Sequence, residues 1–252
     1  MASQSPSAGV TTRPSIRADR SVKGVLVSIS ISFDLTRCIA IADTITSVNA
    51  MSTQTRRYEL KARAQSQRET RDRIAAAAAE LHEEKGVART TVAEIARRAG
   101  VSRLTVYNHF ADLGELLPAC AAHYEALHPA PDLTDALDLE DDGERVRTAL
   151  ARLYAWYREI EPMFGKLFSD RASIPELDEL MAGRIDRYQA DLAEGLAAPF
   201  AFRGRRARQL GALVRLAVAF WSWRRLTDEG LDDEAAAGVM ANAIAAGLGA
   251  AH

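Results

Sequence analysis

Cysteine is scarce in this chain of 252 residues, since only Cys38 and Cys120 occur and they lie far apart in the sequence. A count this low excludes a disulfide-bonded scaffold and is typical of a reducing compartment, so we expect a cytoplasmic protein. Aromatic residues make up only 6% of the chain and glycine only 15 residues, which argues against a strand-rich fold. Alanine-rich runs such as residues 74–81 favour helix instead.

Long apolar runs are also absent. The stretch that comes nearest to one, residues 25–42, is interrupted by Asp34 and Arg37. A membrane-spanning helix needs about 20 consecutive apolar residues, and a secretory signal needs an uninterrupted apolar core. The sequence therefore predicts neither a membrane span nor a secretory signal.

Motifs of catalysis, metal binding and cofactor binding are missing as well. The chain contains no Cys-x-x-Cys pair, no Gly-x-x-x-x-Gly-Lys-Ser/Thr loop and no Gly-x-Ser-x-Gly elbow. Glu125 and His128 have the i, i+3 spacing of a di-iron ligand pair, but that site needs a second Glu-x-x-His, which does not occur. We therefore expect no catalytic residue, no metal and no cofactor.

The net charge of −2 hides an uneven distribution along the chain. Residues 1–127 carry 17 Lys and Arg against 13 Asp and Glu, whereas residues 128–252 carry 15 against 21. A short basic segment contains Arg56, Arg57, Lys61 and Arg63, and its one acidic residue is Glu59. A basic segment beside a helical domain suits a polyanion, and the alternative is a solvated flank without a partner.

Capping signals outline a compact group of short helices within residues 66–127. Ser66 with Glu69, and Thr91 with Glu94, have the spacing of a capping box, which marks the first turn of a helix. A tight glycine-containing turn then separates the second helix from the third. Such a pair of short helices forms a helix-turn-helix, whose second helix fits the major groove of DNA. The alternative is a helical hairpin whose polar face has no partner.

A family resemblance rests on this motif. Residues 91–110 read Thr-Val-Ala-Glu-Ile-Ala-Arg-Arg-Ala-Gly-Val-Ser-Arg-Leu-Thr-Val-Tyr-Asn-His-Phe. Together with Glu115-Leu-Leu, they resemble the DNA-binding domain of the tetracycline-repressor (TetR) family of bacterial regulators over about residues 66–125. The family usually has a lysine three residues after the phenylalanine, where this chain has Leu113. We expect that phosphate contact to be missing and the basic segment to compensate for it.

Eight residues are predicted to contact a double-stranded DNA operator. Polar side chains on the third helix can hydrogen-bond base edges or phosphates. The resemblance assigns Arg103 and Thr105 to bases or nearby phosphates, and it assigns Tyr107 and His109 to phosphates. The full set is Thr91, Arg103, Thr105, Tyr107, Asn108 and His109, together with Arg57 and Lys61 from the basic segment.

The second half of the family's fold is a variable helical domain that dimerises and encloses an effector pocket. Helices are expected here at residues 143–160, 162–171, 174–198, 203–228 and 232–248. The helix over 203–228 is apolar nearly all round, so one stripe can face its own core and another a partner. The alternative is the buried central helix of a monomer. The predicted dimer interface consists of Leu213, Leu216, Phe220, Trp223 and Val239.

Aromatic and methionine side chains gather on the middle helices of this half, as they do in pockets for apolar ligands. The predicted pocket residues are Tyr154, Tyr157, Met163, Phe164, Phe168, Met181 and Tyr188. The alternative is that these side chains simply form core. A pocket lined in this way would take a small apolar or aromatic effector, which the sequence does not identify.

The predicted fold class is all-α, with an N-terminal three-helix helix-turn-helix DNA-binding domain and a C-terminal helical ligand-binding and dimerisation domain. Residues 1–50 are expected to be a disordered tail or to precede a true start at Met51, residues 51–65 to be a basic arm, residues 66–127 the DNA-binding domain and residues 128–252 the effector domain. The expected function is a homodimeric repressor that is released from a palindromic operator by a small molecule. The alternative is a DNA-binding protein without small-molecule control.

Overall fold

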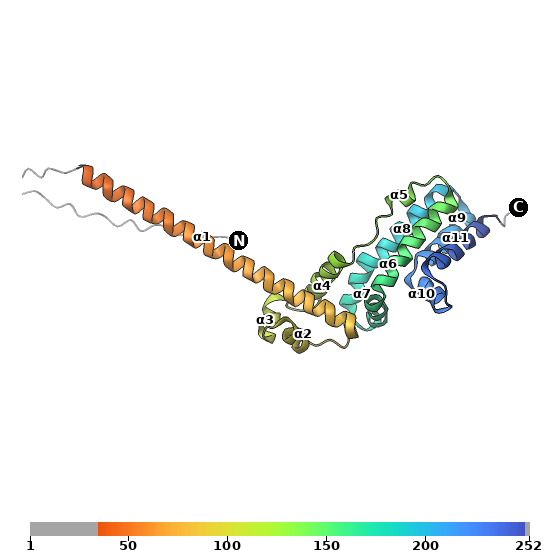
Figure 1. Ribbon diagram of the computed structural model, residues 1–252, viewed down its shortest axis with the longest axis horizontal. Coiled ribbons are helices and arrows are strands. Elements are labelled where there is room, and N and C mark those ends of the chain that lie inside the picture. Colours follow the sequence, from red (N-terminus) through yellow and green to blue (C-terminus); the bar gives the residue numbers. More distant parts are fainter. Residues whose placement is uncertain (1–34, 250–252) are drawn as a thin grey trace, which may run out of the picture. The chain divides into compact units, whose positions relative to one another are not determined.

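The computed structural model describes residues 35–249, and it describes side chains for residues 56–247 (Figure 1). The prediction for residues 1–34 lies outside the described part of the chain. Contacts divide the chain into two units, Met1–Arg57 and Tyr58–His252, and all candidate site residues except Arg57 belong to the second. Every described element is a helix, which confirms the all-α prediction for residues 35–249.

The helices are, in chain order, α1 (Leu35–Lys85), α2 (Val92–Ala99), α3 (Arg103–His109), α4 (Leu113–Leu127), α5 (Thr134–Leu137), α6 (Asp142–Asp170), η1 (Arg171–Ser173), α7 (Pro175–Met181), η2 (Ala182–Asp186), α8 (Arg187–Ala197), η3 (Ala198–Phe200), α9 (Gly204–Val218), α10 (Phe220–Asp228) and α11 (Asp233–Gly249). Helix α11 packs against α6 and α9, and α8 packs against α9 (Figure 1). Within the described part of the chain, none of these helices is both long and apolar enough to cross a membrane.

Helix α1 is longer than the sequence predicts. It runs unbroken through residues 35–85, so the predicted boundaries after residues 50 and 65 are wrong as ends of structural segments, and the basic arm is helical. The capping box predicted at Ser66 is not used, because Ser66 lies inside the helix and its carbonyl accepts a hydrogen bond from the Thr70 hydroxyl at 2.9 Å. Residues 51–85 contain no Gly or Pro that would end a helix.

The helix-turn-helix forms as its capping residues predict. Thr91 and Glu94 make a complete capping box at the start of α2, and Gly100 ends α2 with a φ of 67°. The Ser102 side chain caps α3 by accepting a hydrogen bond from the Thr105 N–H. These local hydrogen bonds satisfy amide groups that would otherwise lack partners at the helix ends.

Two hydrophobic cores lie on either side of a smaller apolar cluster. The first joins α1, α2, α3 and α4 through residues such as Ile74, Ile95 and Phe110. The second joins α6 with α8, α9, α10 and α11 and includes the fully buried Trp223. A small cluster between them consists of Val87, Leu117, Leu177 and Met181. Helix α4 thus contacts α7 directly.

A second link joins the turn after α1 to the end of α6. Oδ2 of Asp170 accepts a hydrogen bond from the Ala88 N–H at 3.0 Å. The neighbouring Gly86 has a φ of +89°, and a Cβ atom there would lie only 2.5 Å from the same oxygen. Only glycine therefore allows both this backbone conformation and this approach.

The C-terminal helices differ from those expected in three places. Helix α6 continues through Pro162, where two helices are expected. The expected helix over 174–198 consists of α7, a π-helical turn and α8. The expected helix over 203–228 breaks at Ala219, whose φ of −72° and ψ of 133° are extended, and this residue separates α9 from α10.

Candidate functional site

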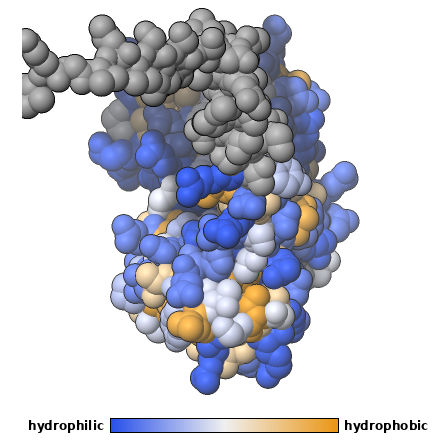
Figure 2. All heavy atoms as spheres, turned by 90° about the vertical axis from the view of Figure 1, so that its left-hand side faces the viewer, coloured by the Kyte–Doolittle hydropathy of each residue, from blue (hydrophilic) through white to orange (hydrophobic). Residues whose placement is uncertain are grey.

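The outer face of α3 carries most of the predicted DNA contacts. Arg103, Tyr107 and Asn108 are exposed, and Tyr107 has 55% of its surface accessible. Thr105 is half-buried, and its hydroxyl lies 2.8 Å from that of Ser102. Figure 2 views the molecule from the side on which α3 lies in Figure 1, and hydrophilic side chains predominate there, with small hydrophobic patches between them.

Leu104 is a further candidate contact, which is absent from the set predicted from the sequence. Its position in α3 suggests an inward side chain, but it is 68% exposed, and Val106 fills the core instead. An exposed leucine on a helix of this kind can contact the methyl group of thymine. Its exposure could have been predicted from its position between Arg103 and Thr105, two polar residues that were assigned to the outer face.

Arg71 of α1 fixes the far end of α3. Its guanidinium donates a hydrogen bond to the carbonyl of His109 and lies 3.9 Å from the centre of the Phe110 ring. Both contacts hold the last turn of α3 against α1. Lys61 is exposed three turns before Arg71, and Arg57 is exposed in the other unit, so its position relative to α3 is not described.

Ion pairs hold α2 against α1. Nζ of Lys85 lies 2.5 Å from Oε1 of Glu94, and this contact, with the hydrogen bond from Thr91, lowers the pKa of Glu94 to about 2. Arg98 donates to the carboxylates of Glu80 and Glu84 at 3.0 and 2.8 Å. Thr91 is exposed at the start of α2, and its hydroxyl donates a hydrogen bond to the Glu94 carboxylate at 2.7 Å and accepts one from the Glu94 N–H.

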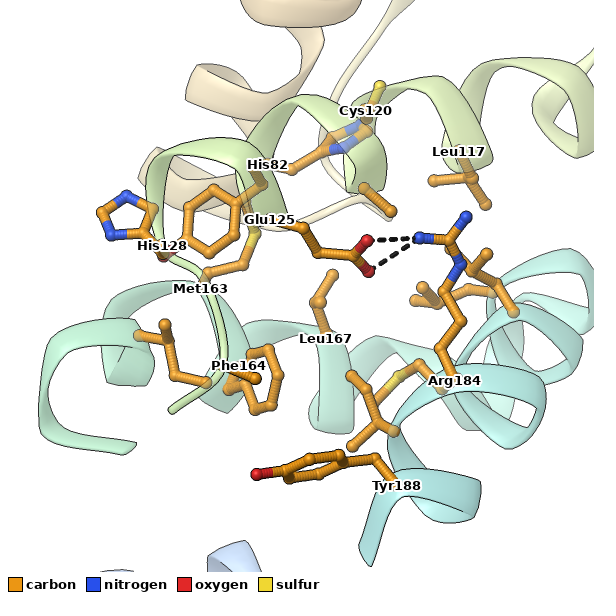
Figure 3. Close-up of a pocket in the computed structure, with 18 of the residues that line it drawn as sticks. His82, Leu117, Cys120, Glu125, His128, Met163, Phe164, Leu167, Arg184 and Tyr188 are labelled. Carbon is orange, nitrogen blue, oxygen red and sulfur yellow. Dashed lines mark hydrogen bonds and ion pairs between the residues drawn. The ribbon is translucent and has the colours of Figure 1, made fainter. Parts of the chain in front are cut away.

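A pocket of about 220 Å³ lies between α4, α6, α7 and α8 (Figure 3). Its walls are mainly apolar and aromatic. The residues that line it are His82, Leu117, Cys120, Ala121, Tyr124, Glu125, His128, Ala130, Trp156, Tyr157, Ile160, Met163, Phe164, Leu167, Leu177, Leu180, Met181, Arg184, Ile185, Tyr188 and Gln189. A cavity of this kind suits a small, mostly apolar ligand.

Five of the seven predicted pocket residues line this cavity, namely Tyr157, Met163, Phe164, Met181 and Tyr188. The prediction is wrong for the other two. Tyr154 is fully buried in the core and donates its hydroxyl proton to the Ala217 carbonyl at 2.6 Å. Phe168 stacks on Phe220 with ring centres 5.3 Å apart. The spacing of aromatic residues along α6 does not distinguish those that line the pocket from those that are packed in the core.

The wall formed by α4 and α1 was not foreseen. Tyr124 and Cys120 come from α4, and His82 comes from α1, so the pocket touches the helix-turn-helix unit itself. Burial lowers the pKa of His82 to about 4, although nearby Asp170 acts in the opposite direction. Burial also raises the pKa of the Cys120 thiol to about 12, so this thiol remains protonated and unreactive.

The ionisable side chains Glu125, Arg184 and His128 of the pocket wall all have partners. The carboxylate of Glu125 accepts two hydrogen bonds from Arg184, at 2.7 and 2.6 Å (Figure 3). Nδ1 of His128 lies 2.6 Å from the carboxylate of Glu159. Glu125 and His128 therefore have separate partners, and no group of side chains suited to a metal ion occurs among the described residues.

The predicted dimer interface is wrong for two of its five residues. Phe220 and Trp223 are buried in the protomer's own core, and the Trp223 indole donates to Asp233 at 2.9 Å. Leu216 and Val239 are exposed, and Leu213 is half-buried. The break at Ala219 explains the difference, because it rotates α10 relative to α9 and exposes Trp221 in place of its neighbours.

Known proteins resemble the chain in both sequence and fold. The family model for bacterial regulatory proteins of the tetR family matches residues 74–120. The HTH-type transcriptional regulator TtgR of Pseudomonas putida is 43% identical over 75 residues, which are 29% of this chain and 34% of that protein. The chain therefore matches about a third of the length of that relative.

A longer match and a solved structure extend the likeness. An uncharacterised HTH-type transcriptional regulator of Mycobacterium tuberculosis is 31% identical over 156 residues, or 59% of this chain and 77% of that protein. A chain from Mesorhizobium loti, described as a TetR-family regulator, shares the fold with a TM-score of 0.51 at 19% identity, covering 71% of this chain and 96% of that one. The protein belongs to the tetR family of bacterial regulatory proteins.

Proposed function

We propose that this protein is a homodimeric transcriptional repressor that binds a palindromic DNA operator and is released by a small molecule. The observation that carries the proposal is the exposed polar face of α3, with its last turn held in place by Arg71. Family membership supports it. Such a regulator would act where the bacterial chromosome lies, in the cytoplasm.

Binding to DNA would use the eight predicted residues together with Leu104. The end of α3 is rigid because Arg71 both hydrogen-bonds the backbone and stacks on Phe110. A rigid helix loses little conformational freedom when it enters the major groove. Lys61 and Arg68, which are exposed on α1, would add phosphate contacts that make binding dependent on salt.

A dimer would place two copies of α3 on one side of the DNA. Half-sites of an operator are about 34–36 Å apart, or a multiple of that distance, so two recognition helices must be held at this spacing. The exposed apolar residues Leu216 and Val239, on the packed helices α9 and α11, are the proposed contact between protomers. Gly247 lets Leu213 come close to α11, because a Cβ there would lie 2.9 Å from the leucine.

The first experiment measures binding of the full chain to labelled DNA tiled across the flanking region of its own gene. Arg103→Ala is expected to lower the affinity for one tile by about 1–3 kcal/mol, as the loss of a base or phosphate contact does. Arg187→Ala is the matched control, since Arg187 is an exposed arginine of α8. Equal affinities of the two variants and the unchanged protein would contradict the proposed role of α3.

Release by a ligand is tested separately. A ligand can shift the protein away from DNA only if it binds more tightly to the conformation that does not bind the operator. A screen by thermal unfolding should identify small molecules that stabilise the protein, and these should then lower operator affinity. If no molecule does both, the alternative of a DNA-binding protein without small-molecule control replaces this part of the proposal.

A further inference from the structure

Two polar side chains of the pocket have no hydrogen-bonding partner among the described residues. The hydroxyl of Tyr188 is buried and unpaired. His82 is 3% exposed and lines the pocket; its ring makes no hydrogen bond within the described part of the chain, its nitrogens are not fully shielded, and Asp170 lies near it. Buried polar groups are nearly always hydrogen-bonded, because an unpaired one costs about 1–3 kcal/mol. The Tyr188 hydroxyl is such a group, and the imidazole of His82 lines the same cavity without a hydrogen bond, so one ligand could supply partners to both.

These two groups lie on different sides of the pocket. Figure 3 shows His82 beside α4 at the top of the view and Tyr188 on α8 at the bottom. Phe164 is drawn between them, and its ring is edge-on to Trp156 with centres 5.7 Å apart. Trp156 also lies edge-on to Tyr188 at 5.9 Å. These three rings are in contact with one another and form one wall of the pocket, against which a flat aromatic ligand would pack.

The charges in the pocket wall do not favour an ionised ligand. Glu125 and Arg184 neutralise each other through two hydrogen bonds. An anion would have to compete with Glu125, and a cation would have to compete with Arg184. An ionised ligand would lose its hydration without gaining a free opposite charge, which is costly in an apolar cavity.

We propose that the pocket binds an uncharged aromatic molecule with a hydrogen-bonding group at each end, one for the His82 imidazole and one for the Tyr188 hydroxyl. This inference rests on the proposed ligand response and specifies its chemistry. The neutral imidazole can donate or accept a hydrogen bond, and so can the tyrosine hydroxyl. Because His82 belongs to α1, such a molecule would connect α8 to the helix-turn-helix unit.

The test compares probes that share one ring system and differ only in their polar groups. 2,6-Dihydroxynaphthalene has a hydroxyl at each end, 2-naphthol has one, naphthalene has none, and 6-hydroxy-2-naphthoate carries a charge. Their affinities for the full chain are measured by fluorescence titration without DNA. Each neutral hydroxyl is expected to increase affinity about two- to tenfold, and the carboxylate is expected to decrease it relative to the diol.

Variants assign the two hydrogen bonds. Tyr188→Phe and His82→Leu should each lower the affinity for the diol about two- to tenfold and leave that for naphthalene unchanged. Tyr154→Phe is the matched control, because Tyr154 has its own partner and does not line the pocket. Tyr188→Phe should not lower the unfolding midpoint of the free protein, since it removes an unpaired hydroxyl.

The proposal is overturned if naphthalene binds as tightly as the diol, if the naphthoate binds more tightly than the diol, or if none of the probes binds. It is also overturned if Tyr188→Phe and Tyr154→Phe have equal effects on the diol. Operator binding is measured on the same preparations. If the protein does not bind an operator but the probes bind in the expected order of affinity, the proposed function fails and the ligand site stands. The two failures are therefore distinguishable.

Discussion

The buried imidazole of His82 should make folding stability depend on pH in a defined window. Its folded pKa of about 4 lies below the ordinary histidine value of 6.5, because burial disfavours the charged ring. Between these two values the unfolded chain binds a proton that the folded chain does not. The contribution of the neutral His82 to the free energy of unfolding is therefore fully present above pH 6.5 and is lost as the pH falls towards 4.

The magnitude follows from the two pKa values. The whole shift corresponds to about 3 kcal/mol, of which about 2 kcal/mol is lost between pH 7 and pH 5. His82 is 3% exposed, so little of this effect is screened by solvent. Since the wild-type chain contains other groups that titrate in this range, the change must be measured against a variant that lacks only this one.

The assay is urea unfolding of the full chain and of His82→Leu at pH 7 and pH 5. The loss of unfolding free energy between the two pH values should be about 2 kcal/mol larger in the unchanged protein than in the variant. All other titrating groups are common to both proteins, so their contributions cancel. Equal losses in the two proteins would refute the assignment of a neutral, buried His82.

Substitutions at three other positions test the remaining structural features. Gly86→Ala should lower the unfolding free energy by about 1–3 kcal/mol in a denaturant titration, because of its positive φ and the close carboxylate of Asp170, and an unchanged value would contradict this. Leu216→Asp should convert a dimer to a monomer in sedimentation without lowering the unfolding midpoint; a persistent dimer would exclude α9 from the interface. Arg71→Leu should weaken operator binding by about 1–3 kcal/mol, because the contact with the Phe110 ring and the hydrogen bond to the His109 carbonyl are lost. Operator affinity is measured by fluorescence anisotropy, and an unchanged affinity would show that α3 does not need this support.

Local signals in the sequence predicted the helix-turn-helix well. The hydrogen bonds of Thr91 and Ser102 join atoms only three residues apart, so they depend on little beyond the local chain. The capping box at Ser66 has the same spacing and is not used, because a helix that is already continuous on both sides needs no cap. A capping signal thus shows where a helix can start, and the residues before it decide whether it does.

Periodicity failed where the backbone changes direction. Phe220 and Trp223 continue the apolar stripe of Leu216 only if α9 and α10 are one helix, and the extended Ala219 changes that phase. No glycine or proline marks the break. The prediction of the pocket wall was incomplete for another reason. His82 lies more than 70 residues before Trp156 in the sequence, and no local pattern indicates that the two residues line the same cavity.

The hydrogen bond between Asp170 and the Ala88 backbone limits how freely the two halves of this protein can be recombined. A chimera that joins this helix-turn-helix to the effector domain of another regulator would keep Gly86 but lack the carboxylate that accepts the hydrogen bond from the turn. The turn would then retain a flexible glycine without its anchor. Grafts that also transfer an acidic residue to the end of α6 should therefore retain regulation more often than grafts that exchange whole domains at residue 128.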